Sequence, residues 1–437
     1  MPSSPPLNLI PSPTRSKSGL ADFPMHSAAE FAVAALLVIT SAFVLSYWTV
    51  VHYLVTRTSR LVPTARAGVA MSRHLLAQDP STLPSVCVVV PAHNEAAVIG
   101  GLVTSLLNQD YPRLSFVFCL DRCTDDTRDV ILGIARSDPR FHIHEVTQCP
   151  PDWAGKVHAL WSGVNGTPEA ARADVLLFAD ADTAFSPSCV SATLAMMRER
   201  GLQMLSLLST LTHRAWFEMI AQPPATLKLI NQFPLIQANR RTPRRPFANG
   251  QFIMMTRGAY EAIGGHRAVQ NEILEDVALA RLAARHSIPA GIFLSDGVMH
   301  CRMYGDWAAF RRGWKRIFTE GFNRKASRLR KAARTVRFTW AIAPVGVLLL
   351  CVAWAVITAP LQEPDDIWPA GFAAVALFTW ITALVRISIR GHSPLWSVLA
   401  HPVGSWIVAD LLLEAARDLE SGVPTYWGGR TYQRASR

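Results

Sequence analysis

The sequence predicts an α/β fold with a mostly parallel, Rossmann-like sheet, joined to membrane helices on both sides. Between residues 84 and 325, short apolar runs alternate with helical stretches, and this alternation is typical of parallel sheets covered by helices. Long apolar segments flank this block, and each is about as long as a bilayer is thick. The composition agrees, because only 17% of the 437 residues are charged, whereas soluble domains average about 25%.

The first part of the chain predicts a single membrane anchor. Residues 1–27 are rich in Pro and Ser and show no apolar period, so we expect a flexible tail. Residues 28–55 are too long for the apolar region of a signal peptide and precede no A-x-A-like cleavage site, so we prefer a retained transmembrane helix. Four arginines follow in the expected linker, 56–83. They favour a cytoplasmic location for the next domain and an outside location for the N-terminus.

Continuous apolar runs predict the strands of the sheet, because a parallel sheet buries its strands on both faces. These runs are residues 86–90, 115–120, 141–146 and 175–179. Helical stretches separate or follow them at residues 96–109, 125–136 and 155–163 and near residue 272. No G-x-G-x-x-G follows the first strand, so dinucleotide binding is not predicted.

The last part of the chain predicts a membrane hairpin, 326–393, and one ambiguous helix. Residues 338–359 and 367–389 are each about one span long. An acidic loop joins them and basic residues flank the pair, which fits a hairpin that leaves the cytoplasm and returns. In residues 394–437 a histidine, a proline and an aspartate interrupt an apolar stretch, and a basic tail follows. The stretch is a fourth span or an interfacial helix, and the tail favours the interfacial helix.

The net charge of +11 is compatible with nucleic acid, anionic lipid or an anionic substrate such as a nucleotide diphosphate. The basic residues cluster beside the apolar segments and no nucleic-acid module is present, so we expect no nucleic-acid partner. The seven cysteines contain no CxxC pair and no zinc spacing. Free thiols in a reducing compartment are therefore expected.

Asp180 and Asp182 are the strongest candidates for chemistry. They follow a buried strand with one alanine between them, and ligands in open α/β sheets bind beyond the carboxyl ends of the strands. Two carboxylates at that point suit a divalent cation that also holds phosphate oxygens. A solvated turn at a strand end is the competing interpretation.

Two other segments are expected near the same sheet edge, and a lysine elsewhere is a further candidate. The loop Pro91-Ala92-His93-Asn94-Glu95 leaves the first strand and can enclose a nucleobase, or it is an ordinary loop. Asp121 ends the second strand, and we expect it to be free to accept hydrogen bonds from a base or ribose. Lys156 lies at a helix start, where a lysine opposes the helix dipole. This placement indicates an anionic ligand, although a surface lysine is the alternative.

Two further segments can serve the acceptor. Glu275 and Asp276 lie in a helix and can supply the carboxylate base that deprotonates an attacking hydroxyl. Adjacent helical residues point about 100° apart, so we expect only one of them to face the site. The basic run Phe310-Arg311-Arg312-Gly313-Trp314-Lys315-Arg316 precedes the hairpin. It is either an interfacial helix that binds anionic headgroups or a clamp on acceptor and diphosphate.

Together these segments resemble the family 2 glycosyltransferases with a GT-A fold. The resemblance covers residues 84–325, more than half of the chain. It is based on six motifs in a fixed order: PAHNE at 91–95, LDRCTDDT at 120–127, GK at 155–156, DAD at 180–182, GGH at 264–266 and LEDVAL at 274–279. The hydrophobic C-terminal region and the closing YWGGRTY at 426–432 look like members that glycosylate carotenoid- or hopanoid-type membrane lipids.

The resemblance implies a role for each candidate residue. The loop with Pro91, His93 and Glu95 would hold the base and ribose of a nucleotide sugar together with Asp121. Asp180 would contact the nucleotide, Asp182 would hold Mg²⁺ or Mn²⁺, and Lys156 would offset the charge of the diphosphate. Asp276 would be the general base of an inverting transfer. Glu275, Arg311 and Trp314 would contact the acceptor or the diphosphate.

Two departures from the family pattern limit the alternatives. Leu120 stands where the family often has the first of two acids. The Gln-x-x-Arg-Trp motif of processive polysaccharide synthases is reduced to Arg311-Arg312-Gly313-Trp314, which disfavours polymer synthesis. A transporter is disfavoured because the three clear spans carry no central ionisable residue. We therefore expect a multi-pass enzyme of the cell membrane with a cytoplasmic catalytic domain, a nucleotide sugar as donor and a lipid as acceptor.

Overall fold

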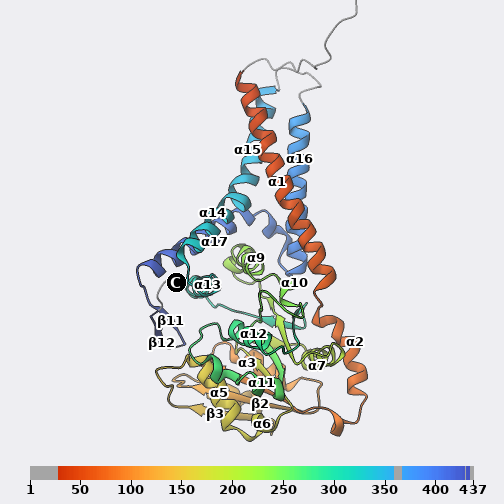
Figure 1. Cartoon of the computed structure of the whole chain (residues 1–437), viewed down its shortest axis with the longest axis vertical. Helices are drawn as coiled ribbons and strands as arrows, with labels where there is room; N and C mark the ends of the chain where they lie inside the picture. The colour runs from red at the N-terminus through yellow and green to blue at the C-terminus, as the bar shows by residue number, and fades with distance from the viewer. Residues whose placement is uncertain (1–27, 359–366, 429, 434–437) are drawn as a thin grey trace, which may run out of the picture.

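A computed structural model describes residues 28–358, 367–428 and 430–433. The expected tail 1–27 and most of the expected acidic loop, 359–366, lie outside these ranges. The described chain consists of an α/β domain and a stalk of three long helices that stands on one side of it (Figure 1). The helices α1 (Ala28–Leu61), α15 (Ala343–Thr358) and α16 (Trp368–Arg390) pack against one another along the stalk.

The main sheet has seven strands in the order β3-β2-β1-β4-β8-β6-β9. Only β8 runs antiparallel to its neighbours, and all other adjacent pairs are parallel, so the predicted mostly parallel sheet is confirmed. The strands are β1 (Val86–Ala92), β2 (Leu114–Asp121), β3 (Phe141–Val146), β4 (Val175–Ala179), β6 (Met204–Leu208), β8 (Phe252–Thr256) and β9 (Ala290–Leu294).

Helices bury both faces of this sheet, which is why its strands are continuous apolar runs. Val88 and Val90 of β1 belong to one core cluster, and the alternating Cys87 and Val89 belong to another. The first face carries α3 (Ile99–Leu107), α4 (Thr127–Ala135) and α7 (Cys189–Glu199), and the second carries α5 (Gly155–Gly166), α6 (Pro168–Arg172), α11 (Arg257–Ala262) and α12 (Glu275–Arg285). Short 3₁₀ turns lie at Pro80–Thr82, Gly265–Val269 and Leu395–Val398.

The strand order places a topological switch point between β1 and β4. From β1 the chain moves outward through β2 and β3 and then returns to pair β4 with the other side of β1. Ligands of open α/β sheets bind in the crevice outside the carboxyl ends of strands at such a point. The loop after β1 and the Asp180–Asp182 turn after β4 therefore share one edge of the sheet.

A small second sheet holds the Asp180–Asp182 turn in place. It contains β5 (Thr183–Phe185), β10 (Met299–Cys301) and β7 (Thr210–Leu211), with β10 in the centre. Strand β5 begins directly after Asp182, and the carbonyl oxygen of Asp182 accepts a hydrogen bond from the Arg302 N–H at 3.0 Å. Distant parts of the chain thus fix the backbone of the turn.

Residues 56–83, expected as a linker, contain the helix α2 (Ala65–Leu76). This helix packs on α7 so closely that a Cβ at Gly68 would lie 2.5 Å from the Ala192 carbonyl oxygen. The segment is therefore a packed part of the α/β domain. Because small, apolar and basic residues alternate in this segment, its helical face was not recognised from the sequence.

Three described helices are long and apolar enough to cross a membrane. The first is α1 (Ala28–Leu61), which extends past the predicted end at residue 55. The second is a continuous helix made of α14 (Ala326–Val336), a π-helical turn (Arg337–Ile342) and α15 (Ala343–Thr358), and the third is α16 (Trp368–Arg390).

The ambiguous C-terminal stretch forms α17 (His401–Glu420), which is not one of these three helices. It packs along α14 and against α13 (Trp307–Gly321) at the base of the stalk (Figure 1). Five ion pairs among the described residues join it to those helices and the π-helical turn: Arg311–Glu414, Lys315–Glu414, Lys315–Asp418, Arg330–Glu420 and Arg337–Asp410. This charged contact face fits the interfacial interpretation.

The remaining elements connect the stalk to the sheet. Three helices, α8 (Trp216–Ile220), α9 (Gln222–Gln232) and α10 (Leu235–Ala238), lie between them. A C-terminal hairpin of β11 (Thr425–Trp427) and β12 (Arg430–Tyr432) returns to the α/β domain. There Arg430 donates hydrogen bonds to the carbonyl oxygens of Pro150 and Trp153, at 2.9 and 2.6 Å.

Candidate active site

A cavity of about 560 Å³ lies at the carboxyl ends of β1 and β4. Its lining comes from the loop after β1, the end of β2, the start of α5, the turn after β4, the segment before β8, the start of α12, the segment after β10, one side of α13 and the C-terminal hairpin. Nine of the site residues predicted from sequence line it: Pro91, His93, Glu95, Asp121, Lys156, Asp180, Asp182, Glu275 and Asp276. The fold therefore collects at one place most of the chemistry that the sequence indicated.

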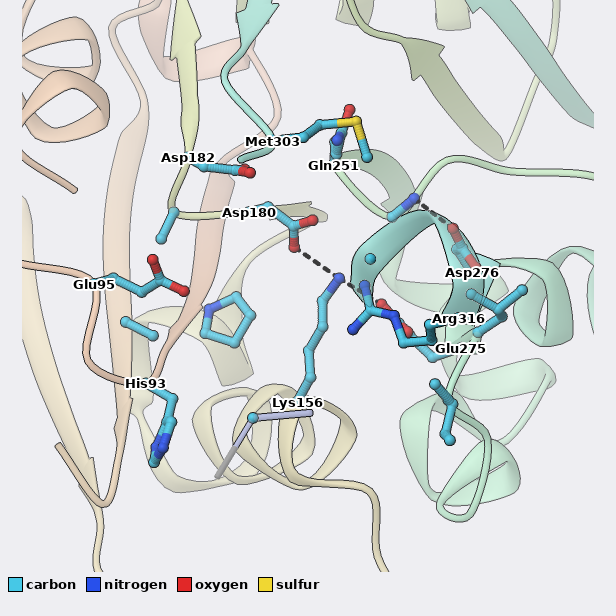
Figure 2. A pocket seen from close by; sticks show the side chains of 18 of the residues that line it. His93, Glu95, Lys156, Asp180, Asp182, Gln251, Glu275, Asp276, Met303 and Arg316 are labelled. Carbon is cyan, nitrogen blue, oxygen red and sulfur yellow. Dashed lines mark hydrogen bonds and ion pairs between the residues drawn. The ribbon is translucent and has the colours of Figure 1, made fainter. Parts of the chain in front are cut away.

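Lys156 connects the two halves of the cavity. Its Nζ lies 2.7 Å from Asp180 Oδ1 and 2.6 Å from Glu275 Oε1, and Figure 2 shows the lysine between them. Burial alone would lower the pKa of Lys156, but the two carboxylates outweigh burial and hold the pKa above its ordinary value. The lysine at the helix start is thus a largely enclosed cation, 15% exposed, and the surface alternative is wrong.

Asp182 is a half-buried carboxylate with one unsatisfied oxygen. Its Oδ1 is inaccessible and has no hydrogen-bond partner among the described residues. Burial, followed by the negative charges of Asp180 and Glu95, raises its pKa to about 8. A buried, poorly paired carboxylate costs free energy, and such groups mark functional sites.

These carboxylates fit a shared divalent cation. Across the described ranges no cluster of three or more His, Cys, Asp or Glu side chains could hold an ion by itself. Mg²⁺ often binds through only one or two carboxylates, with phosphates and waters completing its coordination. The unsatisfied Oδ1 of Asp182, beside Asp180, is suited to that incomplete donor set.

Asp276 lies across the cavity from the Asp180–Asp182 pair (Figure 2). Its Oδ2 accepts a hydrogen bond from the Gly250 N–H at 2.8 Å, and its Oδ1 accepts one from the Val277 N–H at 2.7 Å. Gly250 permits this approach, because a Cβ there would lie 3.1 Å from both Lys156 Nζ and Glu275 Oε1. The carboxylate is therefore held in one orientation by backbone donors.

Both Glu275 and Asp276 face the cavity, so the expectation that only one would do so is wrong. They are the first two residues of α12. Lys156 forms an ion pair with Glu275, and the Gly250 N–H donates a hydrogen bond to Asp276. Burial, followed by the charge of Glu275, raises the pKa of Asp276 to about 7. A base with a pKa near neutral is well matched to proton transfer.

The loop after β1 forms the other end of the cavity. The His93 ring contacts the Asp121 carbonyl oxygen through Nδ1 at 2.6 Å, and the Glu95 N–H donates to Thr127 Oγ1 at 2.9 Å. Burial, followed by the charges of Asp180 and Asp125, raises the pKa of Glu95 to about 7. The loop is therefore attached to the neighbouring β2–α4 connection.

Asp121 is paired with its neighbour, and each of its oxygens keeps a lone pair, so its expected acceptance of hydrogen bonds from a base or ribose stays a prediction. Arg122 donates to both of its carboxylate oxygens, at 2.8 and 2.7 Å. Arg122 has a positive φ of 50°, a conformation that turns its side chain back onto the preceding residue. The pair brings a guanidinium next to Asp121, which lines the cavity, and the motif pattern did not reveal this.

Helix α13 presents a different face to the cavity from the one predicted. Arg312 and Arg316 line it, whereas Arg311 pairs with Glu414 at 2.6 Å on the opposite side. Trp314 is 1% exposed and packs between Phe310 and Phe318 in the helical core. Helical spacing separates positions 312 and 316 from 311 and 314, so the periodicity of this run could have identified the cavity-facing arginines.

Sequence reasoning also missed Gln251 and Tyr304, which line the cavity. Gln251 Oε1 accepts hydrogen bonds from Ser209 Oγ at 2.6 Å and Asn249 Nδ2 at 3.2 Å. The segment Asn249-Gly250-Gln251 follows no strand pattern, and only the position of β8 brings it to the site. Tyr304 carries no local signal beyond its position just after β10.

Comparisons with known proteins agree with the motif pattern. A family model described as Glycosyltransferase like family 2 matches residues 84–313. The chain is similar to the 4,4'-diaponeurosporenoate glycosyltransferase of Staphylococcus aureus strain USA300, at 26% identity over 244 residues. This match covers 54% of the chain but only 61% of the length of that relative.

Two solved structures are also similar to this chain. Mannosyltransferase PcManGT from Pyrobaculum calidifontis, in complex with GDP-Man and Mn²⁺, shares 16% identity at a TM-score of 0.45, covering 89% of this chain and 98% of that one. Glucosyl-3-phosphoglycerate synthase from Mycobacterium tuberculosis shares 16% identity at a TM-score of 0.38, covering 56% and 81%. Because the family model matches more than half of its residues, this chain belongs to glycosyltransferase family 2 and is a glycosyltransferase.

Proposed function

We propose that this glycosyltransferase transfers a sugar from a nucleotide-diphosphate sugar to a hydroxyl of a membrane lipid, in one inverting displacement. The observation that carries the proposal is the arrangement across one cavity of Asp276 and the Asp180–Asp182 pair, with Lys156 between them. One side suits a diphosphate and its counter-ion, and the other offers a base for the acceptor. A single inverting displacement needs the base and the leaving diphosphate on opposite sides of the sugar.

In this reaction the acceptor hydroxyl attacks the anomeric carbon while the bond from that carbon to the diphosphate oxygen breaks. Asp276 takes the hydroxyl proton, because each of its oxygens accepts one backbone N–H and retains a second lone pair. The leaving diphosphate gains negative charge. Lys156, Arg312 and Arg316 lie in the same cavity and stabilise that charge as it develops.

Asp180 and Asp182 would hold a divalent cation, Mg²⁺ or Mn²⁺. When bound, such an ion acts as a Lewis acid that stabilises the charge on phosphate oxygens. Glu95, His93 and Asp121 surround the other end of the cavity and would hold the base and ribose. The Arg122 guanidinium would then lie beside the nucleotide.

The lipid acceptor and the membrane topology have their own support. The first residue of α1, the last of α15 and the first of α16 lie at the end of the stalk far from the α/β domain (Figure 1). For three spans arranged in this way, the arginines after α1 favour an outside N-terminus and a cytoplasmic catalytic domain. The cavity then lies just below the cytoplasmic face of the membrane, where a lipid headgroup can reach it.

A comparison of lipid extracts tests the proposed function. Cells that express the wild-type chain should contain a lipid heavier by one hexose than any lipid of cells without the gene, as measured by mass spectrometry. The anomeric configuration of this product should be opposite to that of the donor. Detection of a polysaccharide instead of a glycolipid, or retention of configuration, would contradict the proposal.

The activity should depend on pH through Asp276. The base must be ionised to take a proton, and its pKa is raised to about 7. We therefore expect kcat/KM for the acceptor, at saturating donor and metal, to fall about tenfold per pH unit below about 7 and to level off above it.

Glu95 supplies the control for this pH profile, because burial raises its pKa to about 7 as well. The Glu95→Gln variant should keep the acidic limb, whereas the residual activity of Asp276→Asn should lack it. Loss of the limb in Glu95→Gln alone would assign the titration to the nucleotide end of the cavity.

A further inference from the structure

A second cavity, of about 210 Å³, lies where the stalk meets the α/β domain. Its lining is mostly apolar and comes from α1, α9 and the end of α16, together with β6 and β7. Val55 and Leu54 contribute from α1, Leu227 and Ile230 from α9, and Ile387 from α16. The family motifs include none of these residues, and the mechanism above does not use them.

The position of this cavity connects the membrane helices to the active site. On the outer side, Leu54 lines the cavity and is still 46% exposed on the surface of the stalk. On the inner side, Ser209 lines the cavity and donates a hydrogen bond to Gln251 at 2.6 Å. Gln251 lines the active-site cavity, so a single hydrogen-bonded pair of side chains separates the two cavities.

The surroundings of the cavity are fixed by contacts between the stalk and the domain. His392, just after α16, pairs with Asp296 at 3.1 Å, and Ser393 contacts His213 through a hydrogen bond of 2.9 Å. These contacts hold the end of α16 against the loops that follow β7 and β9. The cavity is therefore a built feature of the junction.

We propose that this second cavity binds the apolar chain of the acceptor lipid, next to the end that receives the sugar. The inference rests on the proposed function and specifies how its acceptor is held. An apolar chain gains free energy by leaving water for a carbon-lined cavity, and this cavity is continuous with helices of membrane length. Ser209 on its inner side, and Gln251 beyond it in the active-site cavity, would then contact the polar end of the lipid.

Two tryptophan substitutions on α1 form a matched test. Val55→Trp fills the cavity, whereas Val50→Trp places the same ring at a position that is 56% exposed and does not line it. We expect Val55→Trp to raise KM for the lipid acceptor about tenfold, the effect expected when about two methylene groups lose apolar contacts. KM for the nucleotide sugar and its slow hydrolysis without acceptor should stay unchanged in both variants, which also verifies folding.

A photoreactive probe gives a readout that is independent of turnover. A 16-carbon alcohol with a diazirine near its hydroxyl, in phosphatidylcholine vesicles, should label α9 and the segment Leu208–Leu211 in the wild type and in Val50→Trp. Labelling should fall in Val55→Trp and in the presence of the lipid acceptor. Labelling that the acceptor does not displace would assign the cavity to a structural membrane lipid and overturn the inference.

The outcomes separate this inference from the proposed function. A wild-type enzyme that forms no glycolipid defeats the proposed function and the inference with it. An active wild type, with Val55→Trp equal to Val50→Trp in acceptor KM and in labelling, defeats the inference alone.

Discussion

The Asp276→Asn variant is expected to lose about 10³-fold in kcat, within the range of 10²- to 10⁴-fold that positioned bases contribute. Asparagine has the same shape as aspartate but cannot take a proton from the acceptor. KM for the nucleotide sugar should change little, because Asp276 lies across the cavity from the Asp180–Asp182 pair. Steady-state kinetics with the lipid acceptor measures both parameters.

Two controls distinguish loss of the base from loss of structure. The amide of Asp276→Asn can still accept a hydrogen bond from Gly250 or Val277, so we expect the thermal unfolding temperature to remain within a few degrees of the wild type. Glu272→Gln changes an exposed carboxylate just before the same helix and should retain activity. Full activity of Asp276→Asn would remove Asp276 from the chemistry.

The Asp182→Asn variant is expected to show the second large effect, a loss on the order of 10²- to 10⁴-fold in kcat/KM for the donor, as several kcal/mol of charge stabilisation implies. Its residual activity should no longer respond to added Mg²⁺ or Mn²⁺. Electron paramagnetic resonance of Mn²⁺, with a nucleoside diphosphate present, should show weaker binding than in the wild type. This signal reports binding without turnover.

Unlike its activity, the thermal stability of this variant should not fall. Burial of the Asp182 carboxylate raises its pKa to about 8, so replacing it with a neutral amide should not lower the unfolding temperature without metal. Asp174→Asn is the matched control, because Asp174 stands just before the same strand, at its opposite end, and bonds Ser85 there. Persistent metal dependence in Asp182→Asn would contradict the assignment, as would its loss in Asp174→Asn.

The core of the site was predictable from sequence because it depends on strand ends. Buried parallel strands are continuous apolar runs, and the polar residues that follow them gather at one edge of the sheet. For this reason the sequence alone placed Pro91, Glu95, Asp180 and Asp182 at one edge of the sheet. The membrane helices were predictable for a similar reason, since their length and apolarity are local properties.

The orientation of helix faces was not predictable with the same certainty. The basic run on α13 contains four cations, and the sequence favoured Arg311 and Trp314 as contacts of the ligand. Packing against α17 assigns Arg311 to Glu414 and buries Trp314, which leaves Arg312 and Arg316 for the cavity. A helix rotates to bury its best apolar face, and that face is defined only by its partners.

The sequence by itself therefore determined the fold class, the helices of membrane-spanning length and the residues of the DAD and LEDVAL motifs, because each is encoded in a local pattern. Only the tertiary structure decided that Glu275 and Asp276 both face the site and that Arg122 pairs with Asp121. It also decided that the Ser209–Gln251 hydrogen bond joins the wall of an apolar cavity to the wall of the active site. These features depend on contacts between segments that are distant in the chain. Their geometry is set by the packing of whole helices and strands, which no local pattern contains.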